Sequence, residues 1–201
     1  MSLPDAVRIR EIAPRLTFQD HAVPTDVKIE LVRRLVDAGV RAFELSSFVR
    51  PDLVPGLADA AEVFARVPRV PGLSLGCCVA NLRGLARAID AGADTAYFLL
   101  SADEEFARAN IGRSTQDSMR ELERMAAYAA DRNIVLGTYV IFAWGGPTGP
   151  RAPARISNRW PEGSSTSGWT AGFSRIPPAT RRRPRCANSP PPRSRTCRRG
   201  T

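Results

Sequence analysis

Histidine and long apolar runs are the most conspicuous shortages of this sequence. His21 is the single histidine, and the four cysteines form two close pairs, Cys77–Cys78 and Cys186/Cys197, whose spacing fits no common zinc pattern. No apolar run approaches the ~18–20 residues that a helix needs to cross a bilayer. The N-terminal residues also lack the charged and hydrophobic regions of a signal peptide. We therefore expect a cytoplasmic protein with reduced, structural or incidental thiols and no membrane partner.

Acidic residues and lysine are almost missing from the last quarter of the chain. The net charge is +9, yet residues 151–201 hold twelve arginines, no lysine and one acid, Glu162, whereas residues 1–150 carry a net charge of −2. The basicity therefore belongs to the last quarter alone. The larger part of the chain has the charge balance of an ordinary soluble domain, so nucleic acid is not its expected partner.

Residues 150–201 combine those arginines with many prolines and serines and show no hydrophobic periodicity. Such a composition buries too little apolar surface to offset chain entropy, which predicts a disordered tail. The tail could be a nucleic-acid-binding arm, a proline-rich linker, or the product of a shifted reading frame in GC-rich DNA. Many arginines without any lysine, beginning abruptly after a regular pattern, favour the frameshift interpretation.

Residues 7–142 alternate between short strand-like runs and amphipathic helices. Two D-A-G segments, ending at Gly39 and Gly92, each stop a helix directly before a strand. Thr25, Asn81 and Ser114 are the expected helix caps. The predicted strands are 7–12, 40–46, 73–80, 95–100 and 134–142, and the predicted helices are 26–38, 55–66, 82–91 and 114–132.

Repeated βα units with short loops predict a parallel sheet with right-handed crossovers. Both a doubly wound open sheet and a (β/α)8 barrel have this pattern. A barrel needs eight units in typically about 250 residues, and only about five are apparent. The pattern alone leaves both architectures open.

Four motifs narrow this choice. They are R-E-I-A-P-R at residues 10–15, S-S-F-V-R-P-D-L-V-P at 46–55, A-N-L-R-G-L-A-R-A-I-D-A-G-A at 80–93, and S-A-D-E-E-F-A-R-A-N-I at 101–111. In this order the sequence resembles hydroxymethylglutaryl-CoA lyase and its relatives among the metal-dependent (β/α)8 lyases and acyl-CoA condensing enzymes. The resemblance implies an incomplete TIM-type barrel over residues 1–149, followed by the basic tail at 150–201.

The resemblance also implies an activity, namely metal-assisted cleavage of a carbon–carbon bond in a 3-hydroxyacyl-CoA, giving acetyl-CoA and a keto product. Mg²⁺ or Mn²⁺ is the expected cofactor of the family. Arg15 occupies the place of the arginine that polarises the acyl carbonyl, and Glu44 that of a glutamate that positions the reacting groups. The expected substrate-binding residues are Arg15, Gln19, Ser46, Ser47, Asn81 and Ser101.

Independently of the family, Glu44 lies on a strand that should be buried, where an unpaired acid costs several kcal/mol. A site role and an internal ion pair with Arg15 are its two comfortable interpretations. His21 is expected to be a solvated loop residue. Asp103, Glu104 and Glu105 should supply negative charge to a helix N-terminus.

One departure from the family pattern affects the cofactor. Leu16 stands where the family has a metal-binding aspartate, and a leucine side chain has no lone pair for a hard cation. We find no counterpart of the family's His-x-His pair. We therefore expect no metal binding by this chain, a truncated and impaired enzyme, and oligomers or aggregates formed through open sheet edges. The alternatives are a non-catalytic pseudoenzyme domain with a nucleic-acid-binding tail, and a relative with metal-free chemistry.

Overall fold

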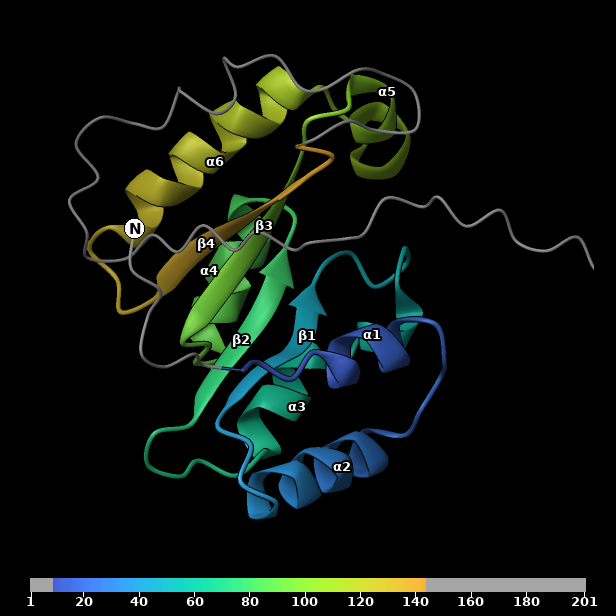
Figure 1. Cartoon of the computed structure of the whole chain (residues 1–201), viewed down its shortest axis with the longest axis vertical. Coiled ribbons are helices and arrows are strands. Elements are labelled where there is room, and N and C mark those ends of the chain that lie inside the picture. The colour runs from blue at the N-terminus through green and yellow to red at the C-terminus, as the bar shows by residue number, and fades with distance from the viewer. Residues whose placement is uncertain (1–8, 144–201) are drawn as a thin grey trace, which may run out of the picture.

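A parallel sheet of four strands, in the order β1-β2-β3-β4, forms the centre of the molecule (Figure 1). The structure, a computed structural model, describes residues 9–143. The strands are β1 (Ala42–Phe48), β2 (Ser74–Val79), β3 (Thr95–Ser101) and β4 (Val135–Ile141). The helices are α1 (Ala13–Gln19), α2 (Thr25–Asp37), the 3-10 turn η1 (Pro55–Leu57), α3 (Ala60–Arg66), α4 (Leu82–Asp90), α5 (Glu104–Phe106), the π-helical turn η2 (Ala107–Ile111) and α6 (Thr115–Ala129).

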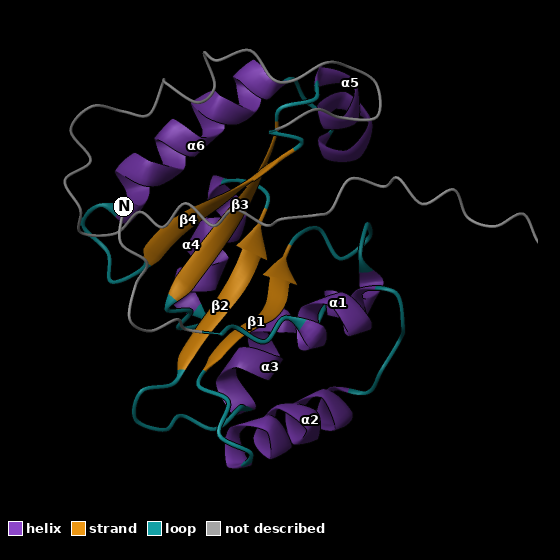
Figure 2. Ribbon diagram, in the orientation of Figure 1, coloured by secondary structure: helices purple, strands orange, loops and turns teal. Residues whose placement is uncertain are grey.

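One face of the sheet carries the hydrophobic core. Helices α2, α3, α4 and α6 contribute apolar side chains to it, and the strands contribute alternate residues such as Phe43, Leu75 and Phe98. Figure 2 shows helix α3 near β1 and helix α4 near β2 and β3, as expected for βα units joined by right-handed crossovers. These four helices thus cover one face of the sheet, and the other face carries polar and aromatic residues.

Local sequence signals place most helix ends. The Asn81 Oδ1 atom accepts a hydrogen bond from the Gly84 N–H (2.9 Å), and the Ser114 hydroxyl accepts one from the Asp117 N–H (3.0 Å). Both predicted caps are confirmed. The predicted Thr25 cap is wrong, because Pro24 is the N-cap of α2 and the Thr25 hydroxyl donates to Asp59 Oδ2 instead.

The predicted first strand, 7–12, is reduced among the described residues to one parallel bridge between Glu11 and Phe43. Pro14, at the start of α1, sets a helical φ and has no N–H to contribute to a ladder. The chain therefore turns into α1 where a strand end was expected. The predicted tail, 150–201, lies outside the described residues. Among the helices of residues 9–143, none is both long and apolar enough to cross a membrane.

Candidate functional site

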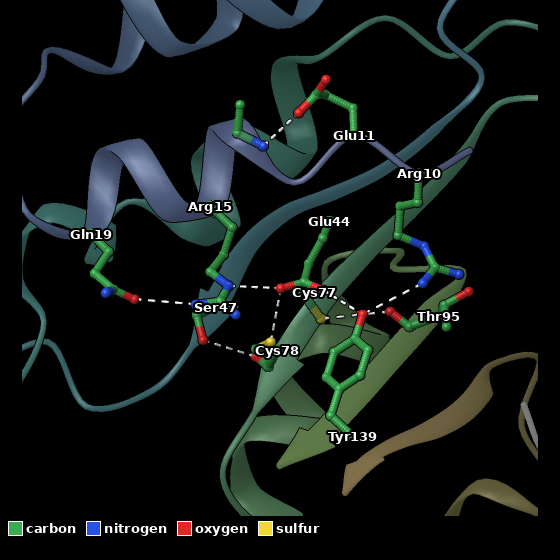
Figure 3. Close-up of polar contacts among 11 residues, drawn as sticks. Arg10, Glu11, Arg15, Gln19, Glu44, Ser47, Cys77, Cys78, Thr95 and Tyr139 are labelled. Carbon is green, nitrogen blue, oxygen red and sulfur yellow. Dashed lines mark hydrogen bonds and ion pairs between the residues drawn. The ribbon is translucent and has the colours of Figure 1, made fainter. Parts of the chain in front are cut away.

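Glu44 lies at the centre of a hydrogen-bond network on the face of the sheet opposite the core (Figure 3). It is 1% exposed, and its carboxylate accepts three hydrogen bonds. The donors are Arg15 Nε (2.7 Å to Oε1), Cys78 Sγ (3.1 Å to Oε1) and the Tyr139 hydroxyl (2.7 Å to Oε2). These donors provide the compensation that a carboxylate at this depth requires.

Arg15 comes to Glu44 from the first turn of α1. Its Nη1 donates to Gln19 Oε1 (3.2 Å), one helical turn further on, and its side chain is 22% exposed. The ion pair, which was one of two interpretations of Glu44 from the sequence, is present. The guanidinium is thus held at Nε and Nη1 and remains partly exposed.

Cys78 and Tyr139 belong to the network but were not predicted from the sequence. Burial, followed by the charge of Glu44, raises the pKa of the Cys78 thiol and of the Tyr139 phenol. Both groups therefore stay protonated at neutral pH and act as donors. The signal that could have found Tyr139 is the alternation of side chains along the predicted strand 134–142, which places every second residue on the sheet face opposite the core.

The Tyr139 ring packs against a second aromatic ring on the same face of the sheet. The rings of Tyr97 and Tyr139 stack with centroids 5.0 Å apart, and the Arg10 guanidinium lies 4.3 Å from the Tyr97 ring centroid. Arg10 Nη1 also lies 3.5 Å from the Tyr139 hydroxyl, at the outer limit of a hydrogen bond. The contacts on this face thus extend from Arg10, next to the Glu11 bridge, to Tyr139 on β4.

A β-bulge decides which serine shares the face of Glu44. Glu44 pairs with Gly76, and Ser46 and Ser47 pair with the next two residues of β2, Cys77 and Cys78. Leu45 is therefore an extra residue on β1 that has no partner on β2. Cys77 belongs to the apolar core, whereas the Ser47 hydroxyl donates to the Cys78 carbonyl (3.2 Å). Ser47, and not Ser46, is therefore on the polar face, although simple alternation would assign Ser46 to it.

Asn81 and Ser101 lie at the carboxyl ends of β2 and β3, the edge at which barrel enzymes hold their substrates. Asn81 Oδ1 caps α4. The fully buried Ser101 hydroxyl donates to the Asp103 carbonyl (2.9 Å) and accepts from the Asp103 N–H (3.1 Å). Asp103 Oδ1 in turn accepts from the Phe106 N–H, which agrees with the expected role of this acidic cluster at a helix start. Asn81 Oδ1 and the Ser101 hydroxyl thus both make local hydrogen bonds, and the substrate-binding role of these two residues stays a prediction.

The described residues do not fit a divalent metal. Leu16, on α1 next to Arg15, is 44% exposed and offers only carbon and hydrogen atoms. His21 is exposed, and within residues 9–143 no three His, Cys, Asp or Glu side chains lie close enough together to hold an ion.

Sequence comparisons identify relatives of this chain among lyases. No family model matches the chain. It is 38% identical over 147 residues to the cytoplasmic 3-hydroxy-3-methylglutaryl-CoA lyase of Rattus norvegicus, covering 72% of this chain and 43% of the relative. It is 35% identical over 158 residues to the mitochondrial hydroxymethylglutaryl-CoA lyase of Arabidopsis thaliana, covering 77% of this chain and 34% of that protein.

Two solved structures extend the likeness to the fold. The HMG-CoA lyase of B. subtilis aligns with a TM-score of 0.71 and 31% identity, covering 78% of this chain and 53% of that one. An A. baumannii HMG-CoA lyase, solved with coenzyme A and 3-methylmalate, aligns with a TM-score of 0.70 and 27% identity, covering 78% of this chain and 52% of that one. The chain spans about half the length of these relatives or less. The described parallel sheet matches part of the TIM-type barrel of the solved lyases. This chain belongs to the hydroxymethylglutaryl-CoA lyase-like family of carbon–carbon lyases and matches the N-terminal portion of its members.

Proposed function

We propose that Arg15, held by Glu44, binds the thioester carbonyl of an acyl-CoA in a lyase-type site. The observation that supports this is the two-point fixation of a partly exposed guanidinium by Glu44 and Gln19. A fixed cation costs little reorganisation when charge develops on a substrate oxygen, which is the usual basis of electrostatic catalysis. Glu44 acts as a positioning residue, and Ser47 is the second polar group on the same face.

The proposed parent reaction is a retro-aldol cleavage of a 3-hydroxyacyl-CoA. The 3-hydroxyl loses its proton and becomes the carbonyl of the keto product while the bond between C2 and C3 breaks. The electron pair of that bond moves into the thioester, so an enolate oxygen forms where Arg15 lies. Protonation of C2 then gives acetyl-CoA. Arg15 stabilises the enolate because a guanidinium stays charged and offers paired N–H donors.

The family depends on a divalent metal, whereas Leu16 and its described neighbours offer no ligand set for one. We therefore propose that this chain binds acyl-CoA but cleaves it poorly. Localisation in the cytoplasm is part of the proposal, and it is supported by the cytoplasmic relative and not by the mitochondrial one. The alternative with a nucleic-acid-binding tail rests on residues outside the described part of the chain.

Two measurements on the full chain test this proposal. Calorimetric titration with acetyl-CoA should show binding that weakens by about tenfold in Arg15→Met, the loss expected for a hydrogen bond to a charged group. Arg33→Met, which removes an exposed arginine of α2, is the matched control and should leave the affinity unchanged. Equal affinity of the wild type and Arg15→Met for acetyl-CoA would contradict the proposed role of Arg15.

The second measurement is turnover of 3-hydroxy-3-methylglutaryl-CoA with added Mg²⁺ or Mn²⁺. We expect no saturable dependence of the rate on metal concentration. Clear turnover that saturates with metal would refute the proposed impairment, while leaving the role of Arg15 to the binding experiment.

A further inference from the structure

A second ionic cluster joins α2 to η1 and to the start of α3. Lys28, on α2, is 4% exposed, and its ammonium group donates to the Gly56 carbonyl (2.6 Å) and to Asp59 Oδ1 and Oδ2 (2.7 and 2.8 Å). The Thr25 hydroxyl donates to Asp59 Oδ2 (2.7 Å) and orients that carboxylate. Lys28 thereby ties η1 and the start of α3 to α2.

Gly56 connects this cluster to α1. A Cβ atom at Gly56 would lie 2.2 Å from the Phe18 carbonyl oxygen, 3.2 Å from that of Gln19 and 3.1 Å from that of His21. The end of α1 therefore rests directly on the backbone of η1, which only a glycine allows. Phe18 is 5% exposed, and its ring centroid lies 5.7 Å from Lys28 Nζ.

We propose that Lys28, Asp59 and Gly56 determine the position of Arg15, because they fix the position of the last turn of α1. The argument follows the contacts: Lys28 fixes the Gly56 carbonyl, Gly56 supports the backbone of Phe18 and Gln19, and Gln19 holds Arg15 Nη1. This inference rests on the proposed function, because it concerns the residue that meets the acyl-CoA.

A positioning role differs from a merely stabilising one in what it predicts. A buried ion pair often adds little stability over an apolar side chain of the same size, but it fixes direction, because the ammonium group must point at its acceptors. We therefore expect Lys28→Met to fold, but with a less well-defined position of α1 relative to the sheet. The contact between Arg15 and Glu44 should loosen in this variant.

The Nε–H resonance of Arg15 in a ¹H–¹⁵N spectrum of the full chain measures this contact, and Arg15→Lys identifies the resonance by its loss. In Lys28→Met we expect the resonance to shift and its exchange with water to accelerate by about tenfold or more. Arg34→Met, on the same helix with a side chain 76% exposed, is the matched control and should leave the resonance in place.

Two further variants test the same contacts if Lys28→Met does not fold, and Thr25→Val is the milder of the two. Gly56→Ala pushes on the Phe18 carbonyl without removing a charge, and Thr25→Val removes only the bond that orients Asp59. Both should shift the Arg15 resonance. An unmoved resonance in variants whose unfolding free energy falls would overturn the positioning role. The readout needs no substrate, so a failure of acetyl-CoA binding by the wild type would refute the proposed function separately.

Discussion

Replacing Glu44 by glutamine tests how much the hydrogen bonds to this carboxylate contribute to the stability of the protein. Glutamine keeps the shape of the side chain but removes its charge and replaces one acceptor oxygen with an NH₂ donor. The three hydrogen bonds to Glu44 are charge-assisted, and each becomes weaker by roughly 1 kcal/mol when the acceptor is neutral. The partial exposure of Arg15 lets its unpaired charge reach water and reduces the penalty. We expect Glu44→Gln to lower the free energy of unfolding by about 2–3 kcal/mol.

Urea denaturation followed by circular dichroism measures this loss, which should lower the midpoint by roughly 1 M. Glu30→Gln is the matched control, because Glu30 also accepts three hydrogen bonds, from Arg33 and Arg34, but lies on the exposed face of α2. Solvent screens that cluster, so its midpoint should equal that of the wild type. If the two variants lose the same stability, or if Glu44→Gln loses none, burial does not decide the strength of the network.

The remaining predictions concern the packing of α4 and the pH dependence of stability. Gly84→Ala should cost about 1–3 kcal/mol in urea denaturation, because a Cβ there would lie 2.5 Å from the Phe48 carbonyl oxygen, and an unchanged midpoint would contradict this packing. The pKa of Tyr139 is raised above its ordinary value of 10.0 in the folded state, so the unfolded chain releases the phenolic proton first and stability should fall as pH rises above 10. Tyr139→Phe should flatten this decline and Tyr128→Phe should not; equal slopes in the two variants would exclude Tyr139 as its source.

Local signals in the sequence are sufficient for much of the fold. Asn81 and Ser114 are followed three residues later by the backbone N–H groups that they cap, so the starts of α4 and α6 depend on neighbouring residues alone. The glycines at 39 and 92 have φ values of +99° and +76°, which explains why the helices before them end there. Such features are readable without knowing the tertiary structure.

The site is less predictable, because its residues meet only through pairing between strands. Glu44 could be assigned a partner, Arg15, since a buried acid needs one. The sequence predicts for Cys78 a reduced, structural or incidental thiol, and no local pattern indicates its contact with Glu44. The bulge after Glu44 exchanges the faces of Ser46 and Ser47, and no signal near these residues distinguishes a bulged strand from a regular one.

The network around Glu44 also sets the order in which this protein can acquire its site. The donors Arg15 and Cys78 are separated from Glu44 by 29 and 34 positions along the chain, but Tyr139 is separated from it by 95. Contacts between distant residues form late, since the closure of a long loop must precede them. Helices α2, α4 and α6 can therefore form early, whereas the carboxylate gains its last donor only when β4 docks. During synthesis, the complete network around Glu44 can form only after β4 has left the ribosome.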